Sequence, residues 1–439
     1  MGLAPLLAIY LVHRCWIKRR PLPGFFAKFT GNGPAVTPGQ VLVHGVSLGE
    51  VMLMRPLLPR LEEALGCRCL VTASTTTGSE ALDKHFADHD RAFWPFDLPW
   101  AVDRFLARTR PRLVVLLELE VWPLMLNACL RRGIPVVVVN GRITPRSVRG
   151  YRRAGILLRP LFRRLGLVLA QNPAWATGFR ALGVPNEKVQ VLGSMKADIV
   201  KPADTTLAQV EGERIGITKS APILLLASTG PGEEEACIAS WKKWGLSTVP
   251  PWRLIICPRH PERGHEVAEI CRRLALDPVR TSQGGRAGDE VRSVVVVDEI
   301  GRLAALYSLC AATNGIAVVG GGLGSGRGGQ NMLEAAAAGC CTVVGWDTRN
   351  QPDAMAALRA VDGVVEMTAM DIYPRLLELS RDAERRRRIG RNGQAAWAAS
   401  KGATERVVAA LRGMINHENP EVRKSCGSGI GSVASRFVG

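Results

Sequence analysis

The sequence predicts an α/β protein made of two Rossmann-like domains, and three observations carry this prediction. The chain has 439 residues, which is too long for one ordinary hydrophobic core and suits two domains of about 200 residues each. Hydrophobic residues make up 47% of it, enough for extensive buried sheets. From residue 41 onward, short β-branched runs alternate with amphipathic stretches, and the alternation occurs twice. Apolar strands separated by helices predict parallel sheets covered on both faces.

The first alternation extends from residue 41 to residue 182. Its strands are predicted at Val41–Val46, Cys69–Ser74, Leu113–Leu117, Pro135–Asn140 and Leu167–Gln171. Its helices are predicted at Glu50–Leu65, Gly78–Phe86, Trp122–Arg132, Leu157–Leu165 and Ala174–Leu182. We therefore assign residues 38–205 to an N-terminal Rossmann-like domain.

The second alternation begins after residues 201–221, whose prolines, threonines and mixed charge we interpret as a linker. Its strands are predicted at Ile223–Ser228, Arg253–Cys257, Ser293–Val297, Ile316–Gly320 and Thr342–Gly345. Its helices are predicted at Glu233–Trp244, His265–Leu274, Leu303–Ala311, Met332–Ala338 and Asp353–Val361. A helical segment from residue 371 to about 416 completes a C-terminal domain at 206–416, and 417–439 is predicted to be a disordered tail.

Two doubly wound domains that face each other across a cleft match the GT-B glycosyltransferase fold. The pattern by itself also fits periplasmic-binding-like proteins and epimerases, which have a similar layout. The formal charge of +18 suits a phosphate-bearing partner, whether nucleic acid, anionic lipid or nucleotide. Aromatic residues make up only 5% and the arginines are spread along the chain, which disfavours a nucleic-acid-binding protein. Eleven cysteines without a CxxC pair predict reduced, buried thiols of a cytosolic compartment and no zinc site.

The N-terminal segment, residues 1–37, begins with the apolar stretch Gly2–Val12, which is followed by four basic residues up to Arg20. The stretch is shorter than the roughly 20 residues that span a bilayer. It has no positive region before it and no A-x-A site after it, which counts against a cleaved signal peptide. Apolar-then-basic order predicts an interfacial anchor on the cytoplasmic leaflet. The alternatives are a frayed helix or a start codon placed slightly late.

A glycine-rich run, Gly320–Asn331, follows a predicted strand and precedes a predicted helix. Glycines allow backbone N–H groups to approach a phosphate, and a helix start adds partial positive charge. We expect a nucleotide-activated sugar to bind here. Asn331 is expected to cap the helix, and Glu334 to accept hydrogen bonds from ribose hydroxyls. The alternative is a flexible surface loop.

Charged residues follow three other predicted strands, and strand ends at the carboxyl edge of such a sheet face the ligand crevice. Arg259 and His260 follow one strand, and the guanidinium can pair with a phosphate. Glu50 lies in the turn His44–Glu50 and suits a general base, or is only a favourable acid in the first turn of a helix. Glu118 and Glu120 follow another strand; they are expected to point the same way, so that repulsion raises one pKa, or to be ordinary acids at a helix start.

Taken together, these segments resemble the 3-deoxy-D-manno-octulosonic acid (Kdo) transferases of lipopolysaccharide synthesis, over about residues 38 to 400. The matching segments, in the family's order, are His44–Glu50, Thr72–Glu80, Trp94–Val102, Glu118–Pro123, Asn140–Ser147, Gly193–Asp198, Ala227–Glu235, Pro258–Arg263 and Gly328–Glu334.

The resemblance implies an inverting, metal-independent transfer of Kdo from CMP-Kdo to a lipid A precursor (lipid IVA). The reaction would take place at the cytoplasmic face of the inner membrane, with no cofactor, since CMP-Kdo is a substrate. It makes residues 38–205 the acceptor domain and 206–416 the donor domain. It implies that Glu50 is the general base and Glu120 a second essential acid. The residues that it places in the CMP site are Arg259, His260, Gly328, Gly329, Asn331 and Glu334, and it gives Ser47 and Lys196 less defined roles.

The sequence departs from the family's pattern within three of its motifs. Ala335 stands where GGHNxLEP has proline. Gly230 stands where the family's AST-H-xGEEE motif has histidine, and Leu124 where asparagine follows Trp-Pro. Gln330 replaces the histidine of GGHNxLEP; it can donate a hydrogen bond but carries no charge, which predicts weaker donor binding. The alternatives are another GT-B enzyme, such as a lipid A disaccharide synthase-like transferase or a 2-epimerase, and a membrane-bound homologue that has lost catalysis.

Overall fold

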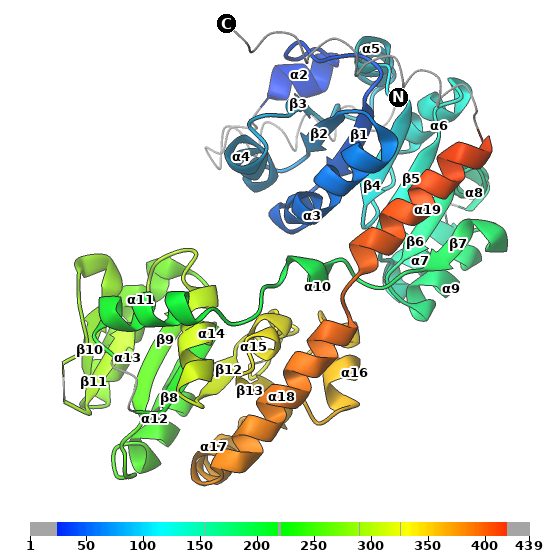
Figure 1. Cartoon of the computed structure of the whole chain (residues 1–439). Coiled ribbons are helices and arrows are strands. Elements are labelled where there is room, and N and C mark those ends of the chain that lie inside the picture. Colours follow the sequence, from blue (N-terminus) through cyan, green and yellow to red (C-terminus); the bar gives the residue numbers. More distant parts are fainter. Residues whose placement is uncertain (1–23, 154, 218–220, 289, 325, 419–439) are drawn as a thin grey trace, which may run out of the picture. The chain divides into compact units, whose positions relative to one another are not determined.

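The computed structural model describes residues 24–153, 155–217, 221–288, 290–324 and 326–418 (Figure 1). The chain divides into two compact units. The first comprises Met1–Ile199 with Gly402–Gly439, and the second comprises Val200–Lys401. Each unit is built around one sheet of seven strands, and every pairing in both sheets is parallel. The predicted α/β class with two Rossmann-like domains is confirmed.

The sheet of the first unit has the order β3-β2-β1-β4-β5-β6-β7. Its strands are β1 (Val41–Gly45), β2 (Cys69–Ala73), β3 (Asp90–Phe93), β4 (Leu113–Leu117), β5 (Val136–Gly141), β6 (Leu167–Ala170) and β7 (Val189–Val191). The five inner strands are the predicted ones. The two edge strands, β3 and β7, were not predicted from the sequence because each is short and only one residue of each is buried.

Helices cover both faces of this sheet, because side chains that alternate along each strand are buried on opposite sides. One face packs against α3 (Leu48–Leu65), α4 (Thr76–His85) and α19 (Ala403–Glu418). The other packs against α5 (Pro99–Thr109), α6 (Pro123–Arg131), α8 (Gly155–Arg163) and α9 (Pro173–Ala181). The short α2 (Phe25–Thr30), α7 (Pro145–Arg153) and α10 (Lys196–Ile199) complete the unit.

The C-terminal helix α19 corrects the predicted domain division. Residues 402–416, expected in the second domain, belong to the first unit, where Val407 and Leu411 are buried in the same core as Leu57 and Leu61 of α3. Asp198 fixes the return of the chain, since its carboxylate accepts hydrogen bonds from the backbone amides of Gly402 and Thr404, both at 2.7 Å. An amphipathic pattern shows which face of a helix is buried but not which sheet it packs against.

The second unit has the sheet order β10-β11-β9-β8-β12-β13-β14. Its strands are β8 (Ile223–Thr229), β9 (Arg253–Pro258), β10 (Asp277–Arg280), β11 (Ser293–Val296), β12 (Ile316–Val319), β13 (Cys341–Gly345) and β14 (Val365–Met367). Its helices are α11 (Thr205–Ile215), α12 (Glu234–Trp244), α13 (Gly264–Arg273), α14 (Leu303–Ala312), α15 (Leu333–Ala337), α16 (Pro352–Arg359), α17 (Ile372–Arg381) and α18 (Ala383–Ala399). The predicted linker is wrong over 205–215, because α11 is a helix of this unit that packs against α14.

The strand order of each sheet indicates where a ligand is expected to bind. The order reverses between β1 and β4 near the middle of the first sheet, and between β8 and β12 near the middle of the second. Ligands of open parallel sheets bind outside the carboxyl ends of the strands at such a point. Glu50 and Glu118 follow β1 and β4, whereas Gly230 and Gly320 follow β8 and β12. The topology therefore gives each unit one candidate ligand site.

Two predicted segments fall outside the described residues: the apolar-basic stretch within residues 1–23 and the tail from 419 onward. Among the residues that the structure does describe, no helix has both the length and the apolar character needed to cross a bilayer.

Candidate active site

Glu50 lies at the third position of α3, directly after the turn that leaves β1. One of its carboxylate oxygens, Oε2, accepts a hydrogen bond from the Val46 amide at 2.5 Å, and the other, Oε1, accepts one from the Ser47 hydroxyl at 3.1 Å. Burial raises the pKa of Glu50, and the negative charges of Glu118 and Glu120 raise it further, against the lowering effect of those two hydrogen bonds. Glu50 thus holds the turn that precedes α3 and is also a carboxylate with an increased affinity for a proton.

Glu118 and Glu120 do not lie on a strand. The strand β4 ends at Leu117, and Glu118 has a left-handed φ of 61°, so the expected alternation of side chains does not apply. Glu118 forms an ion pair with Lys196, with 2.7 Å between Oε1 and Nζ. The pKa of Glu120 is raised by burial and not, as we expected, by repulsion from Glu118. Both carboxylates nevertheless act on Glu50 through their charge, so the structure brings three acids together.

Lys196 reaches Glu118 because two of the matching sequence segments are hydrogen-bonded to each other. Asn140, the last residue but one of β5, has a left-handed φ of 55°, and its side-chain oxygen accepts a hydrogen bond from the Met195 amide at 3.0 Å. Its backbone oxygen accepts one from the Gln171 side chain at 2.8 Å. These bonds fix the start of α10, the helix that begins with Lys196. The resemblance had left the role of Lys196 open; here it carries the positive charge beside the acids.

Two other matching segments support the turn that holds Glu50. The Thr75 hydroxyl donates to the Val46 carbonyl at 2.8 Å, and the Thr75 amide donates to the same oxygen. His44 is buried, stacks on Trp94 with ring centroids 3.9 Å apart, and lies within 2.9 Å of the Thr72 hydroxyl. Burial lowers the pKa of His44 to about 3, so the ring is neutral. His44 is therefore a structural support for the end of β1.

The glycine-rich run of the second unit is held by a buried acid that the sequence analysis did not single out. Glu233 lies just before α12, and its Oε2 accepts hydrogen bonds from the amides of Gly230 and Gly321, both at 2.8 Å. Its Oε1 accepts one from the amide of Leu323 at 2.9 Å. The first glutamate of the segment Glu233–Glu235, at the start of a predicted helix, was the available signal.

Several backbone amides of the run are already bonded within the protein. Gly328 donates to the Asp347 carboxylate at 3.1 Å, Gly329 to the Gly321 carbonyl at 2.9 Å, and Gln330 to the Gly320 carbonyl at 3.0 Å. Gly328 and Gly329 have left-handed φ values of 76° and 79°, which only glycine adopts readily. The helix that follows, α15, has only five residues. The run is therefore a shaped loop, and we expect the positive charge for a phosphate to come mainly from side chains.

Two of the expected donor-site residues are paired with each other. The Asn331 side-chain amide donates to Glu334 Oε1 at 2.9 Å, and its oxygen accepts from the Leu333 amide at 3.2 Å, close to the predicted capping role. Burial raises the pKa of Glu334, although the hydrogen bond from Asn331 and the charge of Arg259 lower it. Arg259 is exposed at the end of β9, with its amide bonded to the Thr229 carbonyl at 2.9 Å. His260 is also exposed, 3.7 Å from Glu262.

Comparison with known proteins identifies the family. Residues 22–199 match the model of the 3-deoxy-D-manno-octulosonic-acid transferase (kdotransferase) N-terminal domain. Over 435 residues the chain is 34% identical to a 3-deoxy-D-manno-octulosonic acid transferase of Bordetella pertussis, with 93% of this chain and 96% of the relative covered. It is 30% identical to one of Haemophilus influenzae, with 88% and 89% covered. The chain belongs to the Kdo transferase family.

Solved structures of other proteins share the fold. The Anabaena protein HepE in complex with UDP has a TM-score of 0.57, 13% identity, and 86% of this chain and all of that chain covered. The UDP-GlcNAc 2-epimerase of Neisseria meningitidis bound to UDP-GlcNAc has a TM-score of 0.55 at 14% identity, with 85% and 99% covered. At this level of identity the likeness concerns architecture alone, and it supports the GT-B fold of this Kdo transferase family member.

The absence of a side chain at Gly230 leaves space that another residue of the glycine-rich run occupies. A Cβ atom built on Gly230 would lie 1.3 Å from Nη1 and 2.6 Å from Cζ of Arg327, so the Arg327 guanidinium fills the place of a side chain at 230. Within the described part of the chain this guanidinium has no hydrogen-bonding or ion-pairing partner, and it is exposed. Because the amide of Arg259 is bonded to Thr229, two arginines lie next to the carboxyl end of β8. Cationic charge is thus supplied from another part of the loop.

The structure also shows the contacts of two other departures, Gln330 and Leu124. The Gln330 side chain packs against Gly321, where a Cβ atom would be 3.2 Å from its Cγ and Nε2 atoms. Leu124, at the second position of α6, is partly exposed, and its amide donates to the Asp97 carboxylate at 3.0 Å. Asp97 thus links two of the matching segments by capping this helix. Among the described residues, no group of three or more histidine, cysteine or acidic side chains is arranged to hold a metal, and nine cysteines are free thiols.

Proposed function

We propose that this chain transfers a Kdo residue from CMP-Kdo to lipid IVA, a lipid A precursor, in lipopolysaccharide core biosynthesis. The observation that carries the proposal is the carboxylate of Glu50, half-buried at the topological switch point of the first sheet, with a raised pKa and two further acids beside it. The sequence relatives are named 3-deoxy-D-manno-octulosonic acid transferases, which supports the transfer of Kdo. A sugar-acceptor reaction needs a base at such a position.

Glu50 is the general base in this mechanism. Its carboxylate takes the proton of an acceptor hydroxyl, and the oxygen attacks the anomeric carbon of Kdo. The bond between that carbon and the CMP phosphate oxygen breaks, and CMP leaves with the electron pair. Attack from the face opposite the phosphate inverts the configuration. A base whose pKa lies nearer to the working pH transfers the proton more efficiently, and this is the effect of the Glu118 and Glu120 charges on Glu50.

The second unit supplies the donor site. Arg259 and Arg327 lie at the end of β8 and provide positive charge for the phosphate that leaves. Glu334, oriented by Asn331, accepts hydrogen bonds from the ribose hydroxyls. Gly328 and Gly329 hold the loop in the conformation that presents Arg327. In the proposed mechanism the two arginines provide the positive charge that a divalent cation provides in other transferases. No step of the mechanism involves a metal ion or a cofactor.

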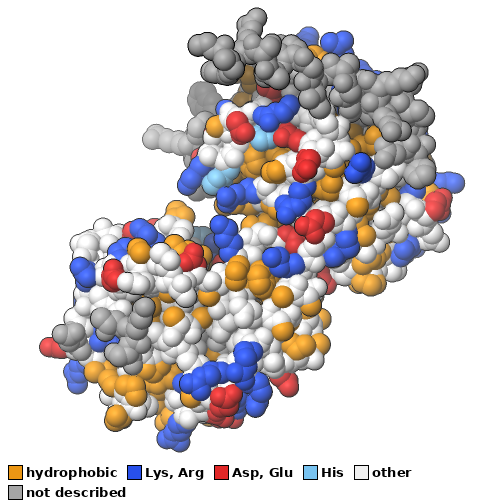
Figure 2. All heavy atoms as spheres, viewed as in Figure 1, with side chains coloured by type: hydrophobic (Ala, Val, Ile, Leu, Met, Phe, Trp, Pro, Cys, Tyr) orange, Lys and Arg blue, Asp and Glu red, His pale blue; other side chains and the backbone are white. Residues whose placement is uncertain are grey.

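We further propose that the protein acts at the cytoplasmic leaflet of the inner membrane. On α2 and α5, the aromatic side chains of Phe26, Phe29 and Trp100 are exposed by 80%, 40% and 49%. Exposed aromatic rings suit the headgroup region of a bilayer. On the face seen in Figure 2, lysine and arginine side chains are distributed over both units, which suits an anionic membrane better than one track along a nucleic acid.

The test compares wild-type protein with the Glu50→Gln variant, using CMP-Kdo and lipid IVA. Wild-type protein should release CMP and form a Kdo-lipid product of inverted configuration by NMR. The variant should lose a factor of about 10² to 10⁴ in rate, because general-base catalysis contributes that much. Glu63→Gln, on the exposed side of the same helix, is the control and should keep its activity. No transfer by wild-type protein would refute the proposal, and equal rates for Glu50→Gln and wild type would exclude Glu50 as the base.

A further inference from the structure

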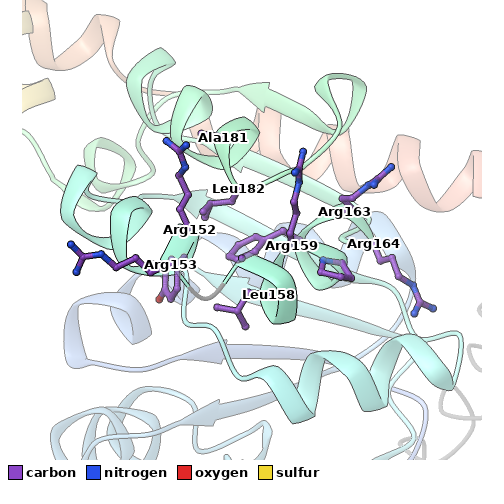
Figure 3. A pocket seen from close by; sticks show the side chains of 12 residues that line it. Arg152, Arg153, Leu158, Arg159, Arg163, Arg164, Ala181 and Leu182 are labelled. Atoms are coloured by element: carbon purple, nitrogen blue, oxygen red, sulfur yellow. The ribbon is translucent and has the colours of Figure 1, made fainter.

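A pocket in the first unit is lined by five arginines and has no assigned ligand. It has a volume of about 940 Å³ and lies between α7, α8 and the end of α9. The arginines are Arg152, Arg153, Arg159, Arg163 and Arg164, all exposed. Figure 3 shows them spread along the pocket, with Arg153 at one end and Arg164 at the other, and with Leu158 and Leu182 between them.

The charge of this pocket is not neutralised within the described part of the chain. None of the five arginines has a carboxylate within ion-pairing distance there, and the only hydrogen bond of a guanidinium is from Arg164 to the Leu130 carbonyl at 3.3 Å. Elsewhere in the same unit, arginines such as Arg91 and Arg132 are paired with aspartates. Five unpaired guanidinium groups around one hollow repel each other, and binding of phosphate groups relieves that repulsion.

The floor of the pocket is apolar and fixed. Phe162 and Leu182 are buried, and the ring of Phe162 contacts Tyr151 with centroids 5.9 Å apart. Gly183, with a left-handed φ of 103°, lets the stems of Arg159 and Arg163 cross it, since a Cβ there would be 2.9 Å and 3.4 Å from their Cγ atoms. Arg159 and Arg163 are four residues apart on α8, so they lie on one face of the helix. The pocket therefore combines separate cationic positions with an apolar base.

One end of the pocket adjoins the acidic site. Tyr151 lines it, and the pKa of this phenol is raised by burial and by the negative charge of Glu120. The helix α7 starts four residues after β5, at the sheet edge where Glu50 lies. The other end of the pocket, where Arg164 is bonded to the Leu130 carbonyl before β5, extends toward the opposite edge. A molecule whose hydroxyl reaches Glu50 would therefore meet the Tyr151–Arg153 end of the pocket first, with Arg159, Arg163 and Arg164 farther along it.

We propose that this pocket binds the phosphate groups of the acceptor, a phosphorylated glycolipid, and thereby positions its hydroxyl for Glu50. The inference rests on the proposed function. The separation of the arginines along the pocket suits a headgroup that carries more than one phosphate, and the apolar floor suits the sugar and acyl parts next to them.

The experiment measures acceptor and donor KM for two double variants, Arg152→Gln/Arg153→Gln and Arg159→Gln/Arg163→Gln. Intact lipid IVA and the same lipid after phosphatase treatment are the acceptors, in detergent micelles. Arg60→Gln/Arg412→Gln is the control, because it removes two charges from another groove of the same unit. Arg159→Lys/Arg163→Lys keeps the charge, and far-ultraviolet circular dichroism checks that each variant folds.

We expect each glutamine pair to raise the KM of the intact acceptor by about tenfold or more, with unchanged donor KM and with the lysine pair recovering part of the affinity. The phosphatase-treated acceptor should bind weakly to wild type, and its KM should change little in the variants. An intact-acceptor KM equal to that of the control, or a rise that is the same for both acceptors, would overturn the inference. So would variants that lose only binding to anionic vesicles, because the ligand would then be the membrane.

Binding of the acceptor without CMP-Kdo separates this inference from the proposed function. If wild type binds intact lipid IVA through these arginines but transfers no Kdo, the proposed reaction is refuted and the assignment of the pocket to the acceptor is supported. If transfer occurs and the glutamine pairs leave acceptor binding unchanged, the pocket assignment fails and the reaction stands.

Discussion

Replacing Gly230 by alanine is the most direct test of how this protein holds the donor phosphate. The φ of Gly230 is not in the left-handed region, so the backbone itself tolerates alanine. The new Cβ atom would lie 1.3 Å from Nη1 of Arg327, whereas non-bonded atoms need about 3.5 Å. The guanidinium must therefore move by about 2 Å, and a charge-assisted hydrogen bond to the CMP phosphate would be broken.

The magnitude follows from the value of such a bond. A hydrogen bond to a charged group contributes about 1.5–3 kcal/mol. Its loss corresponds to a factor of about 10 to 150 in the dissociation constant, because every 1.4 kcal/mol is tenfold. The Arg327→Ala variant should lose the same factor. The double variant Gly230→Ala/Arg327→Ala should bind no more weakly than either single variant, since both changes remove one interaction.

The assay is isothermal titration calorimetry, which measures the dissociation constant of CMP for each variant. Gly324→Ala is the matched control, because Gly324 is in the same loop, does not have a left-handed φ, and has no atom within 4 Å of a built Cβ. It should bind CMP like wild type. If Gly230→Ala also binds like wild type, or if its effect adds to that of Arg327→Ala, the assignment of Arg327 to the phosphate is refuted.

Three further predictions concern the acids and the buried histidine. In Glu118→Gln the acid limb of the pH–rate profile should move to lower pH, because the removed charge raises the pKa of Glu50 in wild type; a limb that stays in place would contradict this coupling. Glu233→Gln should lower the free energy of unfolding of the second unit by about 1–3 kcal/mol and weaken CMP binding, since an amide cannot accept all three loop hydrogen bonds; chemical denaturation and titration measure both. The pKa of His44 is about 3 in the folded protein. As the pH falls below about 6.5, this histidine is therefore protonated in the unfolded chain while it stays neutral in the folded protein, which favours unfolding. Stability should drop by about 2 kcal/mol between pH 6.5 and 5 from this group, and His44→Gln should reduce that slope in urea titrations.

The sequence was sufficient for the ten inner strands and for most of the helices. Continuous apolar runs such as Val136–Val139 have no polar face, so they predict buried parallel strands regardless of what surrounds them. The four edge strands were not predicted, because an edge strand is half-exposed and β10, for example, has no buried residue. The amphipathic pattern of α19 predicts a helix with one buried face. It does not predict that the chain leaves the second unit after Lys401 and that α19 packs on α3 of the first unit.

For the candidate site, local motifs identified Glu50, Glu120 and Arg259 as residues that follow strands, and in the structure they come shortly after β1, β4 and β9. Asn331 and Glu334 lie at the end of the glycine-rich run and in α15, and the part of all five in the reaction stays a prediction. The motifs gave a misleading account of Glu118, because side-chain alternation ends when a residue takes a left-handed φ. Its pairing with Lys196 joins residues 78 positions apart, which no local pattern reveals.

What the sequence by itself determined is the fold class and the family, because these follow from local periodicity and from motifs in a fixed order. It also supplied candidate residues for the chemistry, which stay a prediction. What only the tertiary structure decided is how those residues are used. Glu233 accepts hydrogen bonds from backbone amides of the glycine-rich run, and the Arg327 guanidinium occupies the space where a side chain at position 230 would lie. Both are contacts between segments about 90 residues apart in the chain, and such contacts depend on packing and charge in three dimensions, which a linear pattern does not contain.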